Sequence, residues 1–218
     1  MTEATAEQRR VLVTNGRVSI VQSEISGTVA AGSQGLRLAA GELTISCSKI
    51  SNNTGGGILV ATNQKVVITN SFIVGNTGAG GLNVPVPGQG SVVEFNTIAD
   101  NVAGTGAAAA GGVFCDSAAF TFSNNIVYRN IGGPAPSFRQ TFGNCQFTGS
   151  YVSPNDTADP TSLAFVKDTV PRDYHLTSAS PPTVRNVATA TCEGLVDYDG
   201  DPRPSGGACD LGADELKE

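Results

Sequence analysis

The sequence contains no tryptophan, one methionine and one histidine, and charged residues make up only 15% of its 218 positions. Helix-favouring Lys, Glu and Leu are scarce, whereas Gly is abundant with 27 copies, so an all-β fold is expected. The net charge of -6 argues against nucleic acid as a partner, because a phosphate backbone requires a basic face. No apolar run reaches the ~18 residues that span a bilayer, so we expect no membrane span.

The N-terminal segment MTEATAEQRR has no apolar stretch, so no signal peptide is visible. The low charge and the abundance of Gly, Asn and Thr are nevertheless typical of secreted proteins. We therefore expect an extracellular or cell-surface location, with this sequence as part of a longer protein. A cytosolic protein is the alternative.

A sequence motif of about 11 residues recurs along the chain, for example VVITNSFIVGN at residues 66–76. Its third apolar position is occupied by Ile20, Ile45, Ile68, Val93, Phe122 and Phe147. Five residues later stand Ile25, Ile50, Ile73, Ile98, Val127 and Val152. An upstream apolar position is filled by Val11, Leu36, Ile58, Leu82, Val113 and Phe138. A repeat of this length indicates a solenoid.

Within each repeat the apolar residues alternate two apart, as strands require, and Gly, Asn and Ser separate them. One repeat is therefore a coil of about three short strands, stacked on the next coil at ~4.8 Å. The pattern I-x-N-x-x-I-x-x-N-x-G-G-I resembles the right-handed parallel β-helix of the pectate-lyase-like superfamily. We expect such a helix over residues 11–155, in about six rungs.

Asparagine follows the last apolar position of five repeats, three residues on. The five are Asn53, Asn76, Asn101, Asn130 and Asn155. Asn tolerates left-handed backbone at corners, and its side chain hydrogen-bonds locally. We therefore interpret these residues as a structural ladder in which each Asn bonds to the Asn of the next rung.

From residue 156 to 218 the repeat stops. The segments DPTSLAFV, DYHLTSASPP and LVDYDGDPRPSGGACDLGADE resemble the ending of many bacterial secreted β-helix proteins, although PTVRNVATATC replaces the usual continuation after SP. The resemblance implies a tail that caps the solenoid, because exposed rung ends invite aggregation. At the other end only residues 1–10 are left as a polar cap, which leaves self-association through the N-terminal end open.

The outward positions of the third strands are apolar. They include Phe72, Val74, Ile126, Tyr128 and Tyr151. We predict that the tail folds back and buries this stripe; the alternative is a stripe that binds a sugar or another partner.

Five cysteines suit an oxidising compartment only if they pair. Cys192 and Cys209 flank DYDGDPRP, and we expect a disulfide between them. Cys115 and Cys145 fall on inward positions of adjacent rungs and either pair or pack as small apolar residues. Cys47 is expected to be a buried free thiol. The absence of a CxxC motif argues against a structural zinc site.

The loop DYDGDP places three carboxylates at alternate positions, and such loops wrap Ca²⁺. They belong to Asp197, Asp199 and Asp201. Alternatively, these carboxylates stabilise the turn or pair with Arg203. The sequence therefore requires no cofactor, and Ca²⁺ is the one candidate. His175 in DYHL should point outward, between inward-facing Tyr174 and Leu176, as a structural surface residue.

Polysaccharide lyases need basic groups, which would lie on the outward positions of the first strands. That column reads Leu12, Arg37, Leu59, Asn83, Phe114 and Arg139. The two arginines should lie roughly 19 Å apart, too far to act on one sugar. Asp116 has no second carboxylate beside it, so a two-carboxylate glycosidase site is not evident. Arg37, Asn83, Phe114, Asp116 and Arg139 are therefore kept as candidate binding residues.

Two functions remain open. The first is a non-catalytic secreted or cell-surface module that serves as a scaffold, an adhesin or a glycan-binding element. The alternative is a carbohydrate-active enzyme of the polysaccharide lyase or glycoside hydrolase type, or half of one, that acts on acidic polysaccharide. Enzymatic activity is thus undecided, and a polysaccharide or a surface partner is the expected ligand.

Overall fold

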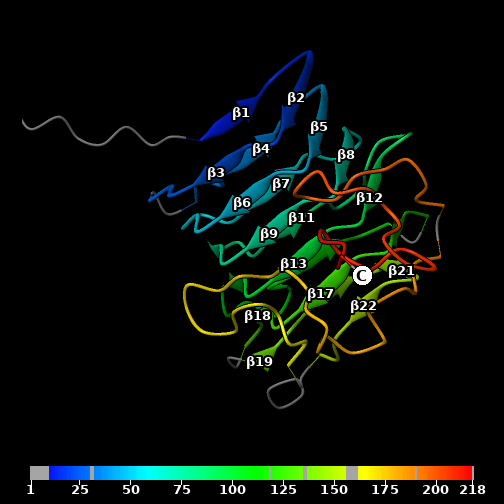
Figure 1. Cartoon of the computed structure of the whole chain (residues 1–218). Coiled ribbons are helices and arrows are strands. Elements are labelled where there is room, and N and C mark those ends of the chain that lie inside the picture. The colour runs from blue at the N-terminus through cyan, green and yellow to red at the C-terminus, as the bar shows by residue number, and fades with distance from the viewer. Residues whose placement is uncertain are drawn as a thin grey trace, which may run out of the picture.

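The computed structural model describes residues 10–29, 32–117, 119–134, 137–155, 162–189 and 191–217. Within these ranges the chain forms a right-handed parallel β-helix followed by an irregular tail, as the repeat predicts. Figure 1 shows the rungs stacked from the blue N-terminal coil to the green and yellow ones, with the tail beside the later rungs. The predicted cap lies outside the described residues except for Arg10, which is exposed and precedes the first strand.

Each coil contributes one strand to each of three six-stranded parallel sheets. The first-strand sheet contains β1 (Val11–Val13), β4 (Leu36–Leu38), β7 (Ile58–Val60), β11 (Leu82–Asn83), β15 (Val113–Cys115) and β20 (Thr141–Gly143). The second-strand sheet contains β2 (Arg17–Val21), β5 (Glu42–Ser46), β8 (Lys65–Thr69), β12 (Val92–Glu94), β16 (Thr121–Ser123) and β21 (Gln146–Thr148). The third-strand sheet contains β3 (Glu24–Ser26), β6 (Lys49–Ser51), β9 (Phe72–Val74), β13 (Thr97–Ala99), β17 (Ile126–Tyr128) and β22 (Tyr151–Val152).

The recurring apolar residues form vertical files inside the coil, which confirms the register that the repeat predicts. Ile45 pairs with Ile20 on one side and Ile68 on the other, and Phe122 pairs with Phe147. The file of the third strands is continuous from Ile25 through Val152. Most of these side chains are fully removed from solvent. The solenoid is therefore held by one continuous apolar core.

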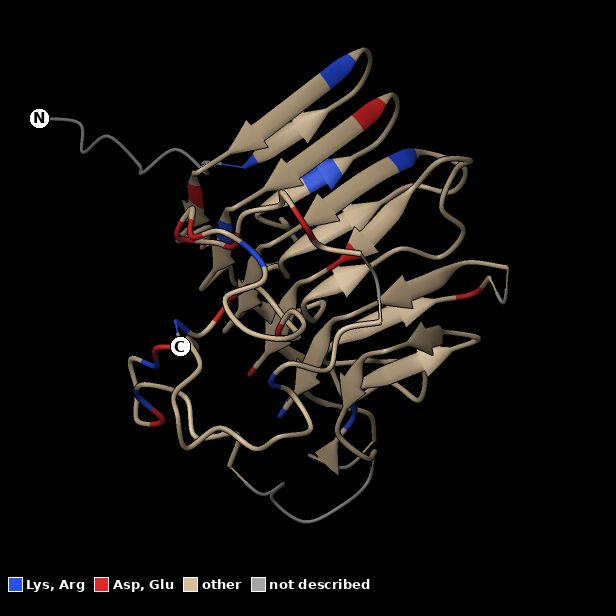
Figure 2. Cartoon of the chain, turned by 45° about the vertical axis from the view of Figure 1, so that its right-hand side comes forward, with Lys and Arg blue, Asp and Glu red and all other residues tan. Residues whose placement is uncertain are grey.

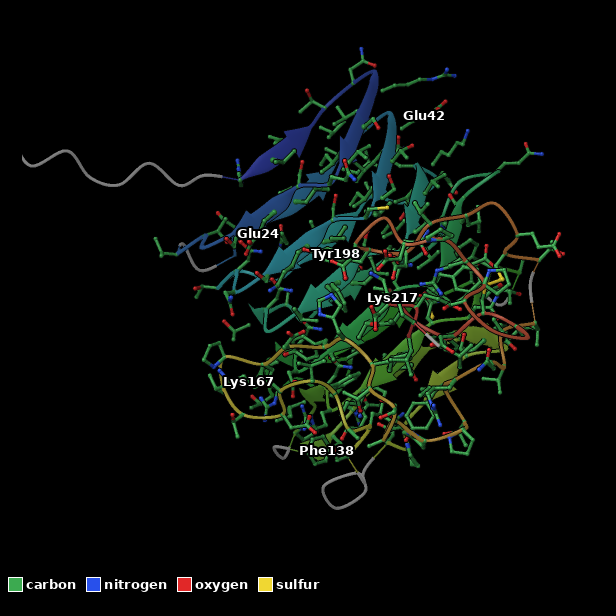
Figure 3. The ribbon with its side chains drawn as sticks, in the orientation of Figure 1. Glu24, Glu42, Phe138, Lys167, Tyr198 and Lys217 are labelled. Atoms are coloured by element: carbon green, nitrogen blue, oxygen red, sulfur yellow. A yellow bond between two sulfur atoms is a disulfide. The ribbon has the colours of Figure 1, made fainter. Side chains whose placement is uncertain are left out.

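The first strand of the sixth rung differs from the prediction, whereas Phe147 and Val152 pair as predicted. Val113 pairs with Thr141, and not with a rung residue at Phe138. Phe138 instead belongs to β19 (Ser137–Phe138), which runs antiparallel to β18 (Ile131–Gly132). Together with β10 (Thr77–Gly78) and β14 (Val102–Ala103) these strands form a small fourth sheet. Figure 3 shows Phe138 at the lower end of the molecule.

The Asn ladder runs through the buried corner after the third strands. Asn76 Oδ1 accepts hydrogen bonds from the backbone N–H and from Nδ2 of Asn53, at 3.1 and 2.9 Å. Asn76 Nδ2 donates to Ile50 O and to Asn101 Oδ1, both at 2.9 Å. Asn101 and Asn130 continue the same pattern. Each Asn therefore satisfies buried groups of two rungs.

Two details of this ladder differ from the prediction. Asn130 bonds not to Asn155 but to Gln140 Oε1, and the backbone N–H of Gln140 then donates to Asn155 Oδ1 at 2.7 Å. Left-handed backbone also falls one residue earlier, for example at Asn52 (φ 54°) and Asp100 (φ 53°). The ladder residue follows the corner that this geometry turns.

A second ladder, not predicted, occupies the corner between the second and third strands. Its members are Ser23, Ser48, Ser71, Asn96, Asn125 and Ser150. Each backbone N–H donates to the side-chain oxygen of the next member, as Ser71 does to Asn96 Oδ1 at 3.1 Å. The residue before each member is left-handed in several rungs, for example Cys47 (φ 46°) and Asn70 (φ 48°).

The tail covers the apolar stripe of the third-strand sheet. Phe72, Ile126 and Tyr128 are buried in one cluster together with tail residues such as Phe165 and Leu176. Figure 2 shows few charged residues along the strands and several in the tail. The stripe is therefore an internal interface, and the sugar-binding alternative for it is wrong.

Two disulfides tie separate segments together. Cys192 and Cys209 are bonded, with their Cα atoms 6.4 Å apart. Cys115 and Cys145 are also bonded, with a Cα separation of 5.4 Å, which decides between the two alternatives left by the sequence. Cys47 is a buried free thiol, as predicted.

The N-terminal end of the solenoid is an open edge among the described residues. β1, β2 and β3 each pair with only one neighbouring strand. The inward side chains of Val18 and Ile20 are half-buried, whereas Ile45 in the next rung is fully buried. Self-association through this end remains a prediction.

Candidate functional sites

The outer face of the first-strand sheet carries three of the candidate binding residues in one column. Arg37 pairs with Leu59, and Asn83 pairs with Leu59 and with Phe114. Arg37 and Phe114 are three rungs apart, or roughly 14 Å. The next residue of the column is Phe142, which takes the position predicted for Arg139.

Phe114 and Phe142 form an aromatic pair on this face. Their ring centroids are 6.2 Å apart and their planes are nearly parallel, at 13°. Both rings are partly exposed, Phe142 by 37%. The Cys115–Cys145 disulfide begins one residue after Phe114 and joins these two rungs. The rings therefore stand on a rigid, cross-linked base.

Arg139 lies over one ring of the aromatic pair, and Asp116 follows the other ring by two residues. Although Arg139 is not in the column, its guanidinium lies 5.6 Å from the Phe142 ring centroid and donates to Ala107 O at 2.7 Å. Asp116 directly follows β15 and is exposed, and its backbone N–H donates to Pro85 O at 2.7 Å. Asn83 and Phe114 are thus adjacent in the column, Asp116 follows Phe114 by two residues and Arg139 lies over the next ring of the column, while Arg37 lies two rungs before Asn83.

The predicted calcium loop is largely occupied by its own chain. Asp197 is fully buried, and its Oδ1 accepts the backbone N–H groups of Asp199 and Asp201 at 2.9 and 2.8 Å. Asp197 Oδ2 accepts the N–H of Glu215 at 3.0 Å. Asp201 forms an ion pair with Lys217 at 2.9 Å. Arg203, the other predicted partner, instead pairs with Glu215. Calcium binding remains a prediction, and the Asp197 geometry favours its turn-forming role.

His175 is partly exposed, as the predicted surface position requires, but it lies in a cluster of carboxylates that the sequence did not predict. Its side chain is 28% exposed, while Tyr174 and Leu176 are buried, as expected. Nδ1 contacts Asp173 Oδ1, and Nε2 lies 3.0 Å from Asp199 Oδ2, in ion-pair range but outside hydrogen-bond geometry. Burial lowers the pKa of His175, but Asp173, Asp214 and Asp199 outweigh it, so the pKa is raised.

A seam between the tail and the third-strand sheet contains two cavities of about 200 and 190 Å³. Lys49, Arg172 and Tyr174 line both of them, and Phe72 and Tyr198 line the larger. Figure 3 shows Tyr198 on the tail, over the sheet. Lys49 has no ion-pair or hydrogen-bond partner among the described residues, and Arg172 Nε lies 3.6 Å from Asp100 Oδ2.

The sequence predicted that the tail covers this sheet, but it did not predict these cavities or the polar residues that line them. The residues of the seam come from segments more than a hundred positions apart, and no spacing rule joins them. Burial strongly raises the pKa of the Tyr174 phenol, and the nearby carboxylate of Asp100 raises it further. Tyr174 therefore stays protonated at neutral pH and cannot serve as a base there.

Comparison with protein families gives one result. A family described as "Right handed beta helix region" matches residues 10–163. No curated protein and no solved structure shows significant similarity to the chain. Among the described residues, no helix has the length and apolar character needed to cross a membrane.

Proposed function

The chain belongs to the right-handed β-helix family, and from this premise we propose that it is a non-catalytic module of a secreted or cell-surface protein that binds a polysaccharide. The proposed binding surface is the outer face of the first-strand sheet around its last rungs. The two disulfides support an oxidising compartment outside the cytosol.

The observation that carries this proposal is the parallel pair of Phe114 and Phe142. Sugar rings present C–H faces that pack against the electron-rich faces of aromatic rings. Two nearly parallel rings on adjacent rungs offer neighbouring contacts to a chain of sugars. The described apolar residues of the tail pack on the third-strand sheet instead, and Phe142 is 37% exposed. Rigid aromatic side chains also lose little conformational entropy on binding.

Polar groups beside the rings would supply orientation. Asn83 offers a donor and an acceptor, Asp116 offers acceptors, and the Arg139 guanidinium retains further donors beside the one bound to Ala107 O. A few directional hydrogen bonds around an apolar platform are typical of ligand sites. Arg139 is basic and Asp116 is acidic, so the surface has no single charge sign. It therefore suits neutral polysaccharides as well as polysaccharides with a few acidic sugars.

A binding role is favoured over lyase chemistry by the state of the seam residues. A lyase would need a base to remove the proton alpha to a uronate. Burial raises the pKa of the Tyr174 phenol, so this group stays protonated at neutral pH. The cationic side chains of Lys49 and Arg172 therefore lie beside a phenol that is a poor base at neutral pH.

The test is a panel of neutral and uronate polysaccharides measured by isothermal titration calorimetry, with a parallel assay for unsaturated uronate products. Phe114→Ala and Phe142→Ala should each weaken binding by about fivefold, since one aromatic contact is worth about 1 kcal/mol. Phe138→Ala, a half-buried ring outside the face, is the matched control and should bind as the parent does. Turnover of any polymer, or equal binding by all three variants, would refute the proposal.

A further inference from the structure

Two carboxylates from separate parts of the tail lie beside the His175 ring. His175, Asp199 and Asp214 each place a potential metal ligand within 4.8 Å of the other two. The three residues border one shallow depression of about 290 Å³, open to solvent, which Asp201 and Lys217 also line. Figure 3 shows Lys217 near Tyr198 on this side of the molecule.

The imidazole is already oriented as metal-binding histidines usually are. Asp173 Oδ1 contacts Nδ1 and also accepts the backbone N–H of His175 at 3.2 Å. A proton held on Nδ1 leaves Nε2 as the free lone pair of the neutral ring. Nε2 makes no hydrogen bond with the described residues, although Asp199 lies close to it. A carboxylate behind a histidine in this way is the usual outer support of a metal ligand.

Asp214 supplies an independent indication. It is only 6% exposed, and Oδ2 accepts the backbone N–H of Leu176 at 2.6 Å. Oδ1 has no hydrogen-bond partner among the described residues, and the side chain borders the depression. A nearly buried carboxylate that borders an open depression and keeps one oxygen free of protein hydrogen bonds can offer that oxygen to a cation.

We propose that His175, Asp199 and Asp214 bind a divalent transition metal ion of the Zn²⁺ class, with water at the open position. The 3.0 Å between His175 Nε2 and Asp199 Oδ2 is close to the roughly 3.3 Å that separates two ligands on a tetrahedral Zn²⁺. Asp199 is about half exposed, so its side chain has room to adjust. An imidazole ligand selects against Ca²⁺, which takes oxygen ligands.

The site would tie together three tail segments that approach one another only in the folded tail. His175 also contacts the Phe72 ring of the third-strand sheet edge-on, with ring centroids 5.2 Å apart. A bound ion would therefore secure the tail above the apolar stripe, and its binding energy would add to folding stability. This site differs from the predicted calcium loop, with which it shares only Asp199.

The experiment titrates the purified chain with Zn²⁺ and with Ca²⁺ by calorimetry, and with Co²⁺ by visible absorption. We expect one Zn²⁺ per chain, a raised Tm with Zn²⁺, and Co²⁺ bands of tetrahedral intensity. Asp199→Ala should abolish Zn²⁺ binding while the far-ultraviolet circular dichroism stays unchanged, because Asp199 is exposed. Asp173→Asn should weaken the affinity for Zn²⁺ about 10–100-fold, because Asp173 supports the His175 ring from behind.

Matched controls separate the alternatives. Glu193→Gln removes an exposed tail carboxylate and should leave Zn²⁺ binding unchanged. Asp201→Asn should also leave Zn²⁺ binding unchanged. If the ion instead occupies the calcium loop, Asp201→Asn should weaken the affinity for Zn²⁺. Unchanged Zn²⁺ affinity in Asp199→Ala and His175→Ala, or no Zn²⁺ binding at micromolar concentration, would overturn the proposal.

Discussion

Arg203 and Glu215 form an ion pair, 3.0 Å from Nη1 to Oε2, and their side chains are 0% and 1% exposed. Nη1 also donates to Asp210 O at 3.0 Å and Nη2 donates to Gly212 O at 2.8 Å. The guanidinium lies 4.8 Å from the centroid of Phe95 at a rung corner. One buried cation therefore links the final tail segment to the β-helix.

We expect Arg203→Met to lower the free energy of unfolding by about 3–5 kcal/mol, because Glu215 would be left as an unpaired buried charge. Urea unfolding followed by circular dichroism measures this. The double variant Arg203→Met/Glu215→Gln should recover part of the loss, since it removes both charges. Arg17→Met is the control, because its ion pair with Glu42 is exposed and worth at most about 1 kcal/mol. Equal losses in Arg203→Met and Arg17→Met would contradict the assignment.

Asn76 lies in the middle of the Asn ladder and satisfies groups on both sides. Asn76→Ala would remove the side-chain partners of the Asn53 N–H and of Ile50 O, and one of the two acceptors of Asn53 Nδ2. At about 1–3 kcal/mol for an unsatisfied buried group, we expect a loss of at least ~2 kcal/mol in unfolding free energy. Asn144→Ala, at an exposed position, should change stability by less than about 0.5 kcal/mol. A neutral Asn76→Ala would show that the ladder is dispensable.

The open N-terminal edge predicts association that depends on concentration. Half-buried Val18 and Ile20 would become fully covered by a second copy stacked on β2. Sedimentation equilibrium should show a larger average mass as concentration rises, and Val18→Lys should restore the monomer. Val166→Lys, at an exposed apolar position of the tail, is the control and should associate as the parent does. A monomer at all concentrations would exclude this interface.

The regular rungs were predictable because a strand that must stack on its neighbours has one register that buries its apolar residues. Ile45 and Ile68 are therefore placed correctly from sequence alone. The first strand of the sixth rung was not, because Phe138 mimics an inward residue while the chain turns back through an antiparallel strand. In the true strand the inward position is held by Thr141, which carries no apolar signal.

The sites depend on contacts that no local pattern encodes. Phe114 was found because its column follows from the rungs, whereas Phe142 was missed with the shifted register. The His175 cluster joins residues up to 39 positions apart in an aperiodic tail, so spacing could not reveal it. The second ladder did have a signal, since a Ser or Asn stands two residues before each third-strand apolar residue, from Ile25 to Val152.

Cys47 is the only free thiol among the cysteines, and it is 9% exposed at a corner of the second rung. Burial raises its pKa, and the nearby carboxylate of Asp197 raises it further, against an opposing effect of Arg203. Because the thiolate is the reactive form, iodoacetamide should label the native protein far more slowly than a free cysteine near pH 8. Unfolding without reductant should release one reactive thiol per chain.

The same shift predicts how stability depends on pH. A native pKa above the unfolded value of about 8.5 means that the folded chain holds the proton more tightly. The resulting stabilisation is fully present below about pH 8.5 and is lost as pH rises through the native pKa. Unfolding free energies measured from pH 7 upward should therefore fall less steeply for Cys47→Ser than for the parent, because serine does not titrate in this range. Identical slopes, or rapid labelling of the folded parent, would show that the thiol is accessible and its pKa ordinary.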